Sequence, residues 1–316
     1  MIVKGGINQI LFKLIHRKGF EQNDTIVICG SIRSGSTWLA EIVSSMEGHV
    51  QLFEPLHPEY VGDVKKIMPE RNWFVESDRD WPEGQSFFNK VLSGKLVNPW
   101  ILSQVPFAKM FGAKRLVVKF VRANLMLGWL ARQPGVRMPI LVMRHPCAII
   151  ASQLNKGWPP SKEILLGNRY FDAWPELKQK CQSLSKPEEI AALAWCLRYH
   201  APLNSPAPQP FILVSYEALV RRGEQELRRI FDAWQMPLSE KSIASLNLPS
   251  DTSESDSFIV QGKDPLAGWK SKLTGEQINN ILNVLNIFGL TFYSEALEPD
   301  YPSLSRFGFD TEVSHD

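Results

Sequence analysis

The sequence predicts an α/β fold, in which a doubly wound parallel sheet is flanked by helices, in one domain spanning residues 1–316. Two observations predict it: short apolar runs without period-two alternation, and helical patterns that fall between those runs. Strands that alternate with helices favour a parallel sheet covered on both faces. A chain of 316 residues, with 44% hydrophobic and 22% charged residues, is long enough for such a core.

The predicted strands are rich in β-branched or aliphatic residues and lie at Thr25–Cys29, Arg115–Phe120, Ile140–Met143 and Phe211–Ser215. A further short strand is expected at Val50–Phe53. Helical patterns occur at Thr37–Met46, Pro146–Leu154, Ile190–His200, Leu219–Trp234 and Gly275–Phe288. Because these helices fall between and after the strands, they are expected to cover the two faces of the sheet.

Two aromatic-rich insertions interrupt this pattern, at residues ~60–110 and ~156–186. Their aromatic residues are Trp73, Phe74, Trp81, Phe87, Phe88, Trp100 and Phe107 in the first, and Trp158, Tyr170, Phe171 and Trp174 in the second. Most of these side chains are expected simply to pack. Long insertions in an α/β core also form the walls and lids of substrate pockets. A few of these aromatic side chains are therefore expected to line such a pocket.

Charge and cysteine usage exclude several classes of protein. Lys and Arg total 35 against 33 Asp and Glu, a net charge of +2, which is too even for a general nucleic-acid binder. The four cysteines, Cys29, Cys147, Cys181 and Cys196, lack the paired spacing of a zinc site or a disulfide framework. Reduced thiols and a cytoplasmic location are the simplest interpretation.

The N-terminal residues 1–20 have helical apolar spacing with nearby basic residues. A short helix packed on the domain is expected, and a membrane-surface contact is the alternative. No run of about 20 apolar residues occurs, so no transmembrane segment is expected.

The segment 26–38 has the pattern of a phosphate-binding loop. An apolar strand leads through a loop containing Gly30 and Gly35 into a helix, an arrangement that presents backbone N–H groups and a helix dipole to an anion. Glycine allows the backbone to approach the phosphate closely. Additional donors come from the side chains of Arg33, Ser34, Ser36 and Thr37.

This loop predicts a P-loop-type fold but differs from that of nucleotide triphosphatases. The spacing from Gly30 to Gly35 fits GxxxxGK[ST], yet Ser36 occupies the place of the lysine that would reach the β- and γ-phosphates. The positive charge lies instead at Arg33, inside the loop. No predicted strand ends in an obvious magnesium-binding Asp, and both observations argue against a kinase or ATPase.

A second anion site is predicted after the strand Ile140–Met143. Arg144 follows the carboxyl end of the strand, which is the usual ligand side of a parallel sheet, and Pro146 suits the first turn of a helix. Ser152 comes eight positions after Arg144, two turns along that helix, and is expected to face the same way. The alternative is a capped helix with a surface arginine.

The sequence Arg-Ser-Gly-Ser-Thr-Trp at 33–38 resembles the 5′-phosphosulfate loop, [KR]SG[ST][ST], of sulfotransferases that use PAPS (3′-phosphoadenosine-5′-phosphosulfate). Its arginine is closer to the carbohydrate, tyrosylprotein and bacterial branches than to the cytosolic steroid and phenol branch. The order Arg144…Ser152 resembles the family's 3′-phosphate site. The resemblance implies that the donor binds Arg33, Ser34, Gly35, Ser36, Thr37, Trp38, Arg144 and Ser152.

Two further donor contacts are implied by the resemblance. Gly262–Lys270 is similar to the late loop RKGxxGxWK that closes over the nucleotide, which places Lys263 on the motif's lysine. Trp38 matches a position that lies against adenine, and Tyr216 is similar to a strand-end tyrosine that reaches the purine. Trp38 and Tyr216 could equally be core aromatics.

The resemblance also suggests which residues are catalytic. Arg33 is the first candidate to stabilise charge on the leaving oxygen, and Lys119 matches the lysine of the KTH motif. Val121 occupies the position of that motif's basic histidine, so the base must lie elsewhere. Glu54, in Phe-Glu-Pro, is the expected base, as a glutamate is in other branches, and His57 is the alternative. A turn cap at Glu54 and a surface position for His57 are the non-catalytic interpretations.

The implied activity is in-line transfer of the sulfuryl group of PAPS to a hydroxyl or amine of a small-molecule or glycan acceptor, with release of PAP and without a metal. The alternatives are a P-loop nucleotide kinase or a catalytically inactive PAP-binding protein. A monomer or a homodimer is expected.

Overall fold

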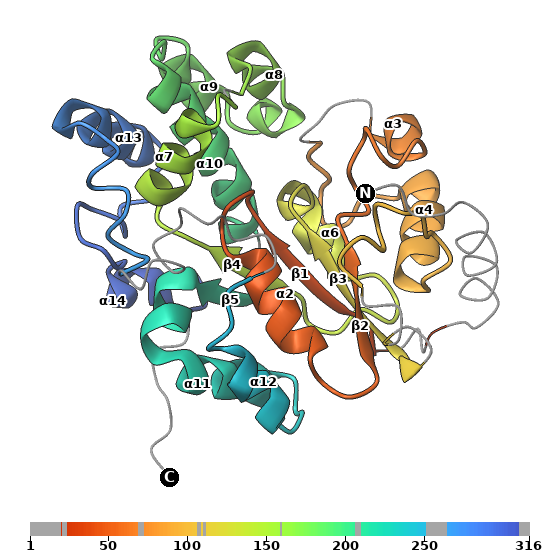
Figure 1. Ribbon diagram of the computed structural model, residues 1–316. Helices are drawn as coiled ribbons and strands as arrows, with labels where there is room; N and C mark the ends of the chain where they lie inside the picture. The colour runs from red at the N-terminus through yellow and green to blue at the C-terminus, as the bar shows by residue number, and fades with distance from the viewer. Residues whose placement is uncertain are drawn as a thin grey trace.

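The computed structural model describes residue 20 and residues 24–68, 73–105, 109, 112–158, 160–205, 210–250 and 264–309. Within them, five parallel strands form one sheet in the order β2-β3-β1-β4-β5 (Figure 1). The strands are β1 (Ile26–Gly30), β2 (His49–Phe53), β3 (Arg115–Phe120), β4 (Ile140–Met143) and β5 (Ile212–Ser215). After β1 the chain builds β2 and β3 on one side, then β4 and β5 on the other. The topological switch point therefore lies at the carboxyl ends of β1 and β4.

The predicted strands are all present, and three of them have shifted ends, including the one predicted from Val50, which begins at His49. The first predicted strand begins one residue too early, because Thr25 makes only an isolated bridge to Val136. It also ends one residue too early, because Gly30 pairs with Val142 of β4. The strand predicted from Phe211 begins at Ile212. The doubly wound α/β fold is confirmed.

The predicted helices are present as α2 (Ser36–Ser44), α7 (Pro146–Asn155), α10 (Pro187–Leu203), α11 (Tyr216–Ala233) and α13 (Gly275–Ile287). Helices α10 and α11 start three residues earlier than their apolar periodicity indicated, because caps define those ends. The Glu189 carboxylate accepts from the backbone N–H of Lys186, just before α10. The Ser215 hydroxyl accepts from the N–H of Ala218 in the first turn of α11.

The insertions carry most of the remaining short elements. The first contains α3 (Val64–Ile67) and α4 (Pro82–Leu92), and the second contains α8 (Lys162–Leu166), η3 (Arg169–Asp172) and α9 (Pro175–Cys181). Elsewhere lie η2 (Asn124–Met126), α6 (Leu127–Leu130), α12 (Glu240–Ser245) and α14 (Tyr301–Ser305). The predicted N-terminal helix, Phe107 and Lys263 fall outside the described residues. No helix in the described part of the chain is long and apolar enough to cross a membrane.

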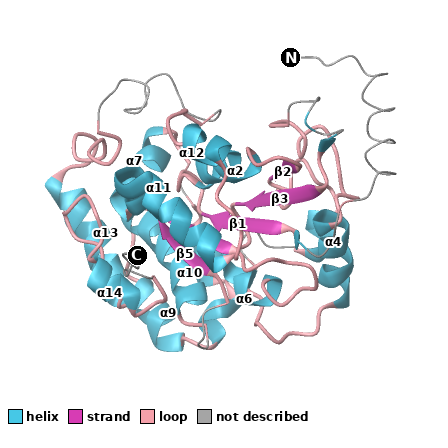
Figure 2. Ribbon diagram, turned by 90° about the horizontal axis from the view of Figure 1, so that it is seen from below, coloured by secondary structure: helices cyan, strands magenta, loops and turns pink. Residues whose placement is uncertain are grey.

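Helices cover both faces of the sheet, with α2 and α12 on one side and α6 and α10 on the other (Figure 2). Alternate strand residues enter two separate cores: Ile26 and Ile28 pack in the core with α2 and α11, whereas Val27 and Cys29 pack in the core with α7 and α10. Both faces of β1, β4 and β5 are thus buried in apolar surroundings. This explains why the strand sequences lack a polar–apolar alternation.

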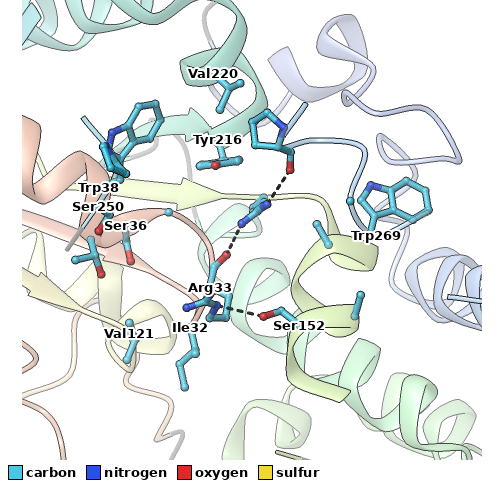
Figure 3. Close-up of a pocket in the computed structure, with 18 of the residues that line it drawn as sticks. Ile32, Arg33, Ser36, Trp38, Val121, Ser152, Tyr216, Val220, Ser250 and Trp269 are labelled. Carbon is cyan, nitrogen blue, oxygen red and sulfur yellow. Dashed lines mark hydrogen bonds between the residues drawn. The ribbon is translucent and has the colours of Figure 1, made fainter. Parts of the chain in front are cut away.

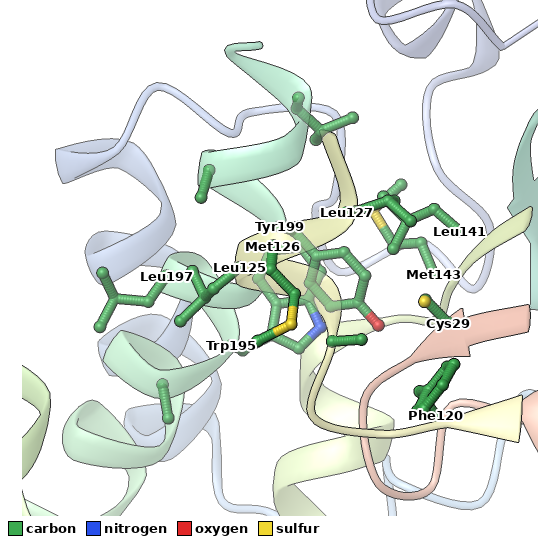
Figure 4. Packing of buried hydrophobic residues seen from close by; sticks show 14 of the residues in the cluster. Cys29, Phe120, Leu125, Met126, Leu127, Leu141, Met143, Trp195, Leu197 and Tyr199 are labelled. Carbon is green, nitrogen blue, oxygen red and sulfur yellow. The ribbon is translucent and has the colours of Figure 1, made fainter. Parts of the chain in front are cut away.

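Helix α10 joins the ends of the two central strands. The Tyr199 hydroxyl donates to the carbonyl oxygen of Val142 at 3.0 Å and accepts from the N–H of Ser31 at 3.3 Å. The neighbouring Trp195 donates its indole N–H to the carbonyl oxygen of Arg144 at 3.1 Å. Figure 4 shows both rings packed beside Cys29 of β1 and Met143 of β4. The segments that follow β1 and β4 are therefore fixed to the same helix.

We expect Tyr199→Phe to lower the free energy of unfolding by about 1–3 kcal/mol, because it leaves buried backbone groups without a partner. Tyr301→Phe is the matched control, since it deletes the hydroxyl of a partly exposed tyrosine that bonds to the side chain of Glu298. Chemical denaturation of both variants measures the difference. Equal losses in the two variants would contradict the role given to Tyr199.

Candidate active site

The loop between β1 and α2 requires both of its glycines. Gly35 has φ 88°, and a Cβ there would lie 2.3 Å from the ring of Tyr216. A Cβ on Gly30 would lie 2.5 Å from the Ser34 hydroxyl and 3.1 Å from the carbonyl oxygen of Val142. Arg33, between them, has φ 69°, which is unfavourable for a residue with a side chain. The turn is thus strained and tightly enclosed, as a site that wraps an anion requires.

Donors are concentrated where this loop meets α2. Gly35 is the N-cap of α2 and has no side chain with which to cap the first-turn N–H groups. The hydroxyls of Ser31 and Ser34 are buried and have no partner among the described residues. Ser36 and Thr37 occupy the first turn of the helix and line a cavity with Arg33 and Gly35. Orphaned polar atoms at a helix N-terminus fit a bound phosphate or sulfate.

Arg144 lies beside this loop, directly after β4. One terminal nitrogen donates to the carbonyl oxygen of Arg33 at 3.1 Å, and the other donates to that of Pro265 at 3.3 Å. Its guanidinium lies 4.2 Å from the ring centroid of Tyr216. The Arg144 Nε is buried without a partner in the described part of the chain. Arg144 therefore holds the loop and still has an unused donor.

Ser152 of α7 reaches the same place. The Arg33 Nε donates to the Ser152 hydroxyl at 3.2 Å, as the dashed line in Figure 3 shows. Arg33, Arg144 and Ser152 all line one cavity of about 480 Å³. The structure thus brings the two anion motifs of the sequence together. It also directs the Arg33 side chain towards Ser152, a contact that the sequence did not predict.

The segment carrying Arg144 is anchored by a buried carboxylate. Glu217 accepts hydrogen bonds from the N–H of His145 at 2.8 Å, from the Ser215 hydroxyl at 2.8 Å and from the Tyr293 hydroxyl at 3.0 Å. Burial raises the pKa of Glu217, and these hydrogen bonds oppose the rise. The contacts tie the end of β4 to the start of α11, which fixes the entry of α7 and hence the position of Ser152.

Glu54 and Lys119 form an ion pair at the other end of the cavity. The Lys119 Nζ lies 2.6 Å from the Glu54 Oε1, and the Arg122 guanidinium lies 3.3 Å from the Oε2. Only 3% of the Lys119 side chain is exposed. Burial lowers the pKa of Lys119, while the charge and hydrogen bond of Glu54 act to raise it. Glu54 has φ 44°, so both Arg33 and Glu54 hold strained backbone at the cavity.

His57 and Val121 are placed differently from Glu54. The His57 ring packs in an aromatic group, 4.9 Å from Trp100 and 4.6 Å from Tyr60 between ring centroids. The ring does not line the cavity formed by the described residues, although the backbone N–H of His57 donates to the carbonyl oxygen of Glu54. Val121 does line the cavity and offers no proton acceptor. The geometry therefore favours Glu54 over His57 as the group that faces a substrate.

Trp38 and Tyr216 form one wall. Their ring centroids are 5.9 Å apart in an edge-to-face arrangement, and the Trp38 indole donates to the carbonyl oxygen of Leu248 at 3.1 Å. The segment 246–250 lines the cavity beside them. Tyr216 also packs under Gly35 and Arg144, so its ring supports the loop. A flat ligand such as a purine would meet aromatic surface here.

Sequence reasoning missed several residues of this cavity and its edge. Arg122 contacts Glu54 and could have been found as a basic residue just past the end of β3. Trp100 of the first insertion donates to the carbonyl oxygen of Glu54 at 3.3 Å. Trp158, 52% exposed, is the insertion aromatic that lines the cavity itself, while Trp81 and Phe171 are buried in the core. The expectation that most insertion aromatics pack is therefore confirmed.

The described residues contain no group of three or more His, Cys, Asp or Glu side chains that could hold a metal ion. All four cysteines are buried and free. The charged groups at the cavity are mainly cations, with Glu54 as the carboxylate between Lys119 and Arg122. Such a site can bind an anionic ligand and accept one proton.

No family model and no curated protein sequence matches the chain. The solved structures that it resembles include the sulfotransferase domain of the Synechococcus PCC 7002 olefin synthase, which is 19% identical over 88% of this chain and 98% of that chain, with a TM-score of 0.45. A Mycobacterium tuberculosis sulfotransferase is 14% identical over 90% and 85% of the two chains, with a TM-score of 0.42. A mouse sulfotransferase complexed with PAP is 13% identical over 89% and 88%, with a TM-score of 0.40. All three of these structural neighbours are sulfotransferases or sulfotransferase domains.

We expect Glu54→Gln to lower the pKa of Lys119 further, because it removes the charge and the hydrogen bond that oppose desolvation. The folded-state pKa of Lys119 is already below its usual 10.5. The free energy of unfolding therefore rises with pH between the folded-state pKa and 10.5. In the variant this rise should begin at a lower pH. An NMR titration of the lysine side chains measures the shift, with the exposed Glu59→Gln as control. An unchanged Lys119 titration would contradict the ion pair.

Proposed function

We propose that this protein is a PAPS-dependent sulfotransferase, which moves the sulfuryl group of PAPS to a hydroxyl or amine of a small-molecule or glycan acceptor and releases PAP. The observation that carries the proposal is the convergence of Arg33, Arg144 and Ser152 at one cavity. A phosphate loop alone would suit many nucleotides. A second cationic site beside it supports a nucleotide with phosphates on both sides of its ribose.

In this proposal the phosphate loop and the Arg144–Ser152 pair bind the donor. The loop N–H groups and the hydroxyls of Ser34, Ser36 and Thr37 bind the 5′-phosphosulfate. Arg144 and Ser152 bind the 3′-phosphate, which distinguishes PAPS from ATP. Trp38 and Tyr216 provide aromatic surface for the adenine. Lys263, which lies outside the described residues, stays a prediction for the loop over the nucleotide.

The chemistry requires one bond to form and one to break. The acceptor oxygen or nitrogen attacks the donor sulfur in line, the bond from sulfur to the bridging oxygen breaks, and PAP leaves with the electron pair. Glu54 takes the acceptor's proton. Lys119, held 2.6 Å from Glu54, and Arg33 stabilise the charge that develops on the leaving oxygen. His57 acts instead only if the aromatic group around it rearranges.

PAP should bind at least about tenfold more tightly than 5′-AMP, because each charge-assisted contact contributes roughly 1.5–3 kcal/mol. Arg144→Ala should abolish the preference, and the milder Ser152→Ala should narrow it. Isothermal titration calorimetry measures both nucleotides on each variant.

Arg228→Ala is the matched control, since Arg228 is 59% exposed and pairs with Glu224 on α11. It should leave both affinities unchanged. If the wild-type protein binds PAP and AMP equally, the 3′-phosphate site is wrong. Magnesium-dependent binding of ATP in preference to PAP would favour the nucleotide kinase instead.

A further inference from the structure

Two polar side chains, one just beyond β3 and one on α10, have no hydrogen-bond partner among the described residues. Asn124 begins η2, directly after the turn that follows β3, and is 2% exposed. Both its amide nitrogen and its amide oxygen lack hydrogen-bond partners within the described residues. A buried amide without a partner carries the full cost of its desolvation, so an unmet polar group here indicates a bound molecule.

Arg198 of α10 is the second such group. Its side chain is partly buried and makes no hydrogen bond or ion pair with any other residue that the structure describes. Its burial lowers its pKa to about 10, so the guanidinium is still a cation at neutral pH. An unpaired cation in such surroundings destabilises the fold, and its retention is a sign of function.

The fold brings together the two elements that carry these residues. Helix η2 packs against α10, and Figure 4 shows Leu125 and Met126 of η2 beside Trp195 and Tyr199 of α10. Arg198 is close enough to Arg122 for the charges to repel, and Arg122 lies 3.3 Å from the Glu54 Oε2. Arg122 therefore connects Arg198 to Glu54, and α10, which carries Arg198, packs on η2.

Arg198 adds a positive charge to a region where Glu54 already pairs with Lys119 and Arg122. In the proposed complex the donor's phosphates are matched by Arg33 and Arg144, which leaves Arg198 available to another anion. An anionic group on the acceptor would compensate this charge.

The geometry points to an acceptor that carries its own anionic group, a carboxylate or a phosphate, which binds Arg198 and the Asn124 amide while its hydroxyl or amine meets Glu54. This inference rests on the proposed sulfotransferase function and narrows it from any small molecule or glycan to a small anion. The guanidinium can donate two parallel hydrogen bonds to such a group, and the Asn124 amide nitrogen supplies a further donor.

The test uses the full chain saturated with PAP, so that binding of an acceptor can be measured without turnover. The probes are ω-hydroxy carboxylates of increasing length, each with its methyl ester and with the corresponding hydroxyalkyl phosphate. Isothermal titration calorimetry compares wild type with Arg198→Met and Asn124→Leu. Arg228→Met is the control on the exposed side of α11.

At least one carboxylate or phosphate should bind roughly tenfold or more tightly than its uncharged ester, a difference of about 1.4 kcal/mol or more. Arg198→Met should abolish that preference and leave PAP affinity unchanged. It should also keep or raise the melting temperature, because it removes a buried unpaired charge. Comparing the affinities of the carboxylates with those of the phosphates shows which anion the site prefers.

Equal binding of anions and esters to the wild-type complex would overturn the inference. So would a preference that survives Arg198→Met, or a melting temperature that falls by several degrees with the preference intact, which would mark Arg198 as structural. Failure of PAP itself to bind would instead contradict the proposed function. The two failures are therefore distinguishable.

Discussion

The hydroxyl of Tyr199 links the two halves of the anion site. It bonds to the N–H of Ser31 at the start of the phosphate loop and to the carbonyl oxygen of Val142 in β4. Arg144 follows two residues after Val142. Its carbonyl oxygen accepts a hydrogen bond from Trp195, which lies on α10 together with Tyr199. The loop and the arginine that we propose to bind the two ends of the nucleotide thus share one support. Their separation is set by the packing of α10 on the sheet.

The site also contains backbone strain and buried polar atoms without partners among the described residues. Arg33 and Glu54 both have positive φ, and both line the cavity. Ser31 and Ser34 have buried hydroxyls, and Arg144 a buried Nε, without partners in the described part of the chain. Each of these features costs free energy in the isolated protein. The phosphates of the proposed donor would accept hydrogen bonds from the unpartnered hydroxyls and from the Arg144 Nε.

The sequence predicted most of the fold because the relevant signals are local. Buried strands such as Ile140–Met143 are continuous apolar runs, and the phosphate loop is a short motif at a strand-to-helix junction. The starts of α10 and α11 were predicted late, because capping by Glu189 and Ser215 defines those ends. Capping signals are individual side chains, and apolar periodicity does not show them.

The contacts around Glu54 could not be predicted in the same way. Arg122 contacts Glu54 although the two residues are 68 positions apart in the sequence. Arg198 lies near Arg122, on a helix whose periodic pattern gives no sign of function. Trp100 reaches Glu54 from the first insertion, where most aromatic residues only pack. Such contacts depend on tertiary arrangement, since the residues belong to different layers of the fold. The donor motifs, in contrast, each lie within one strand–loop–helix unit.

The central claim is that this site transfers a sulfuryl group, and the most direct measurement is the fate of label from PAPS carrying a radioactive sulfate. The protein, without added metal, is incubated with this donor and a mixture of hydroxylated acceptors. We expect label to appear in an acceptor, and we expect Glu54→Gln to abolish transfer while PAP still binds. Label that stays in PAPS with the wild-type protein across all acceptor classes, despite tight PAP binding, would contradict the account and indicate a nucleotide-binding protein without transferase activity.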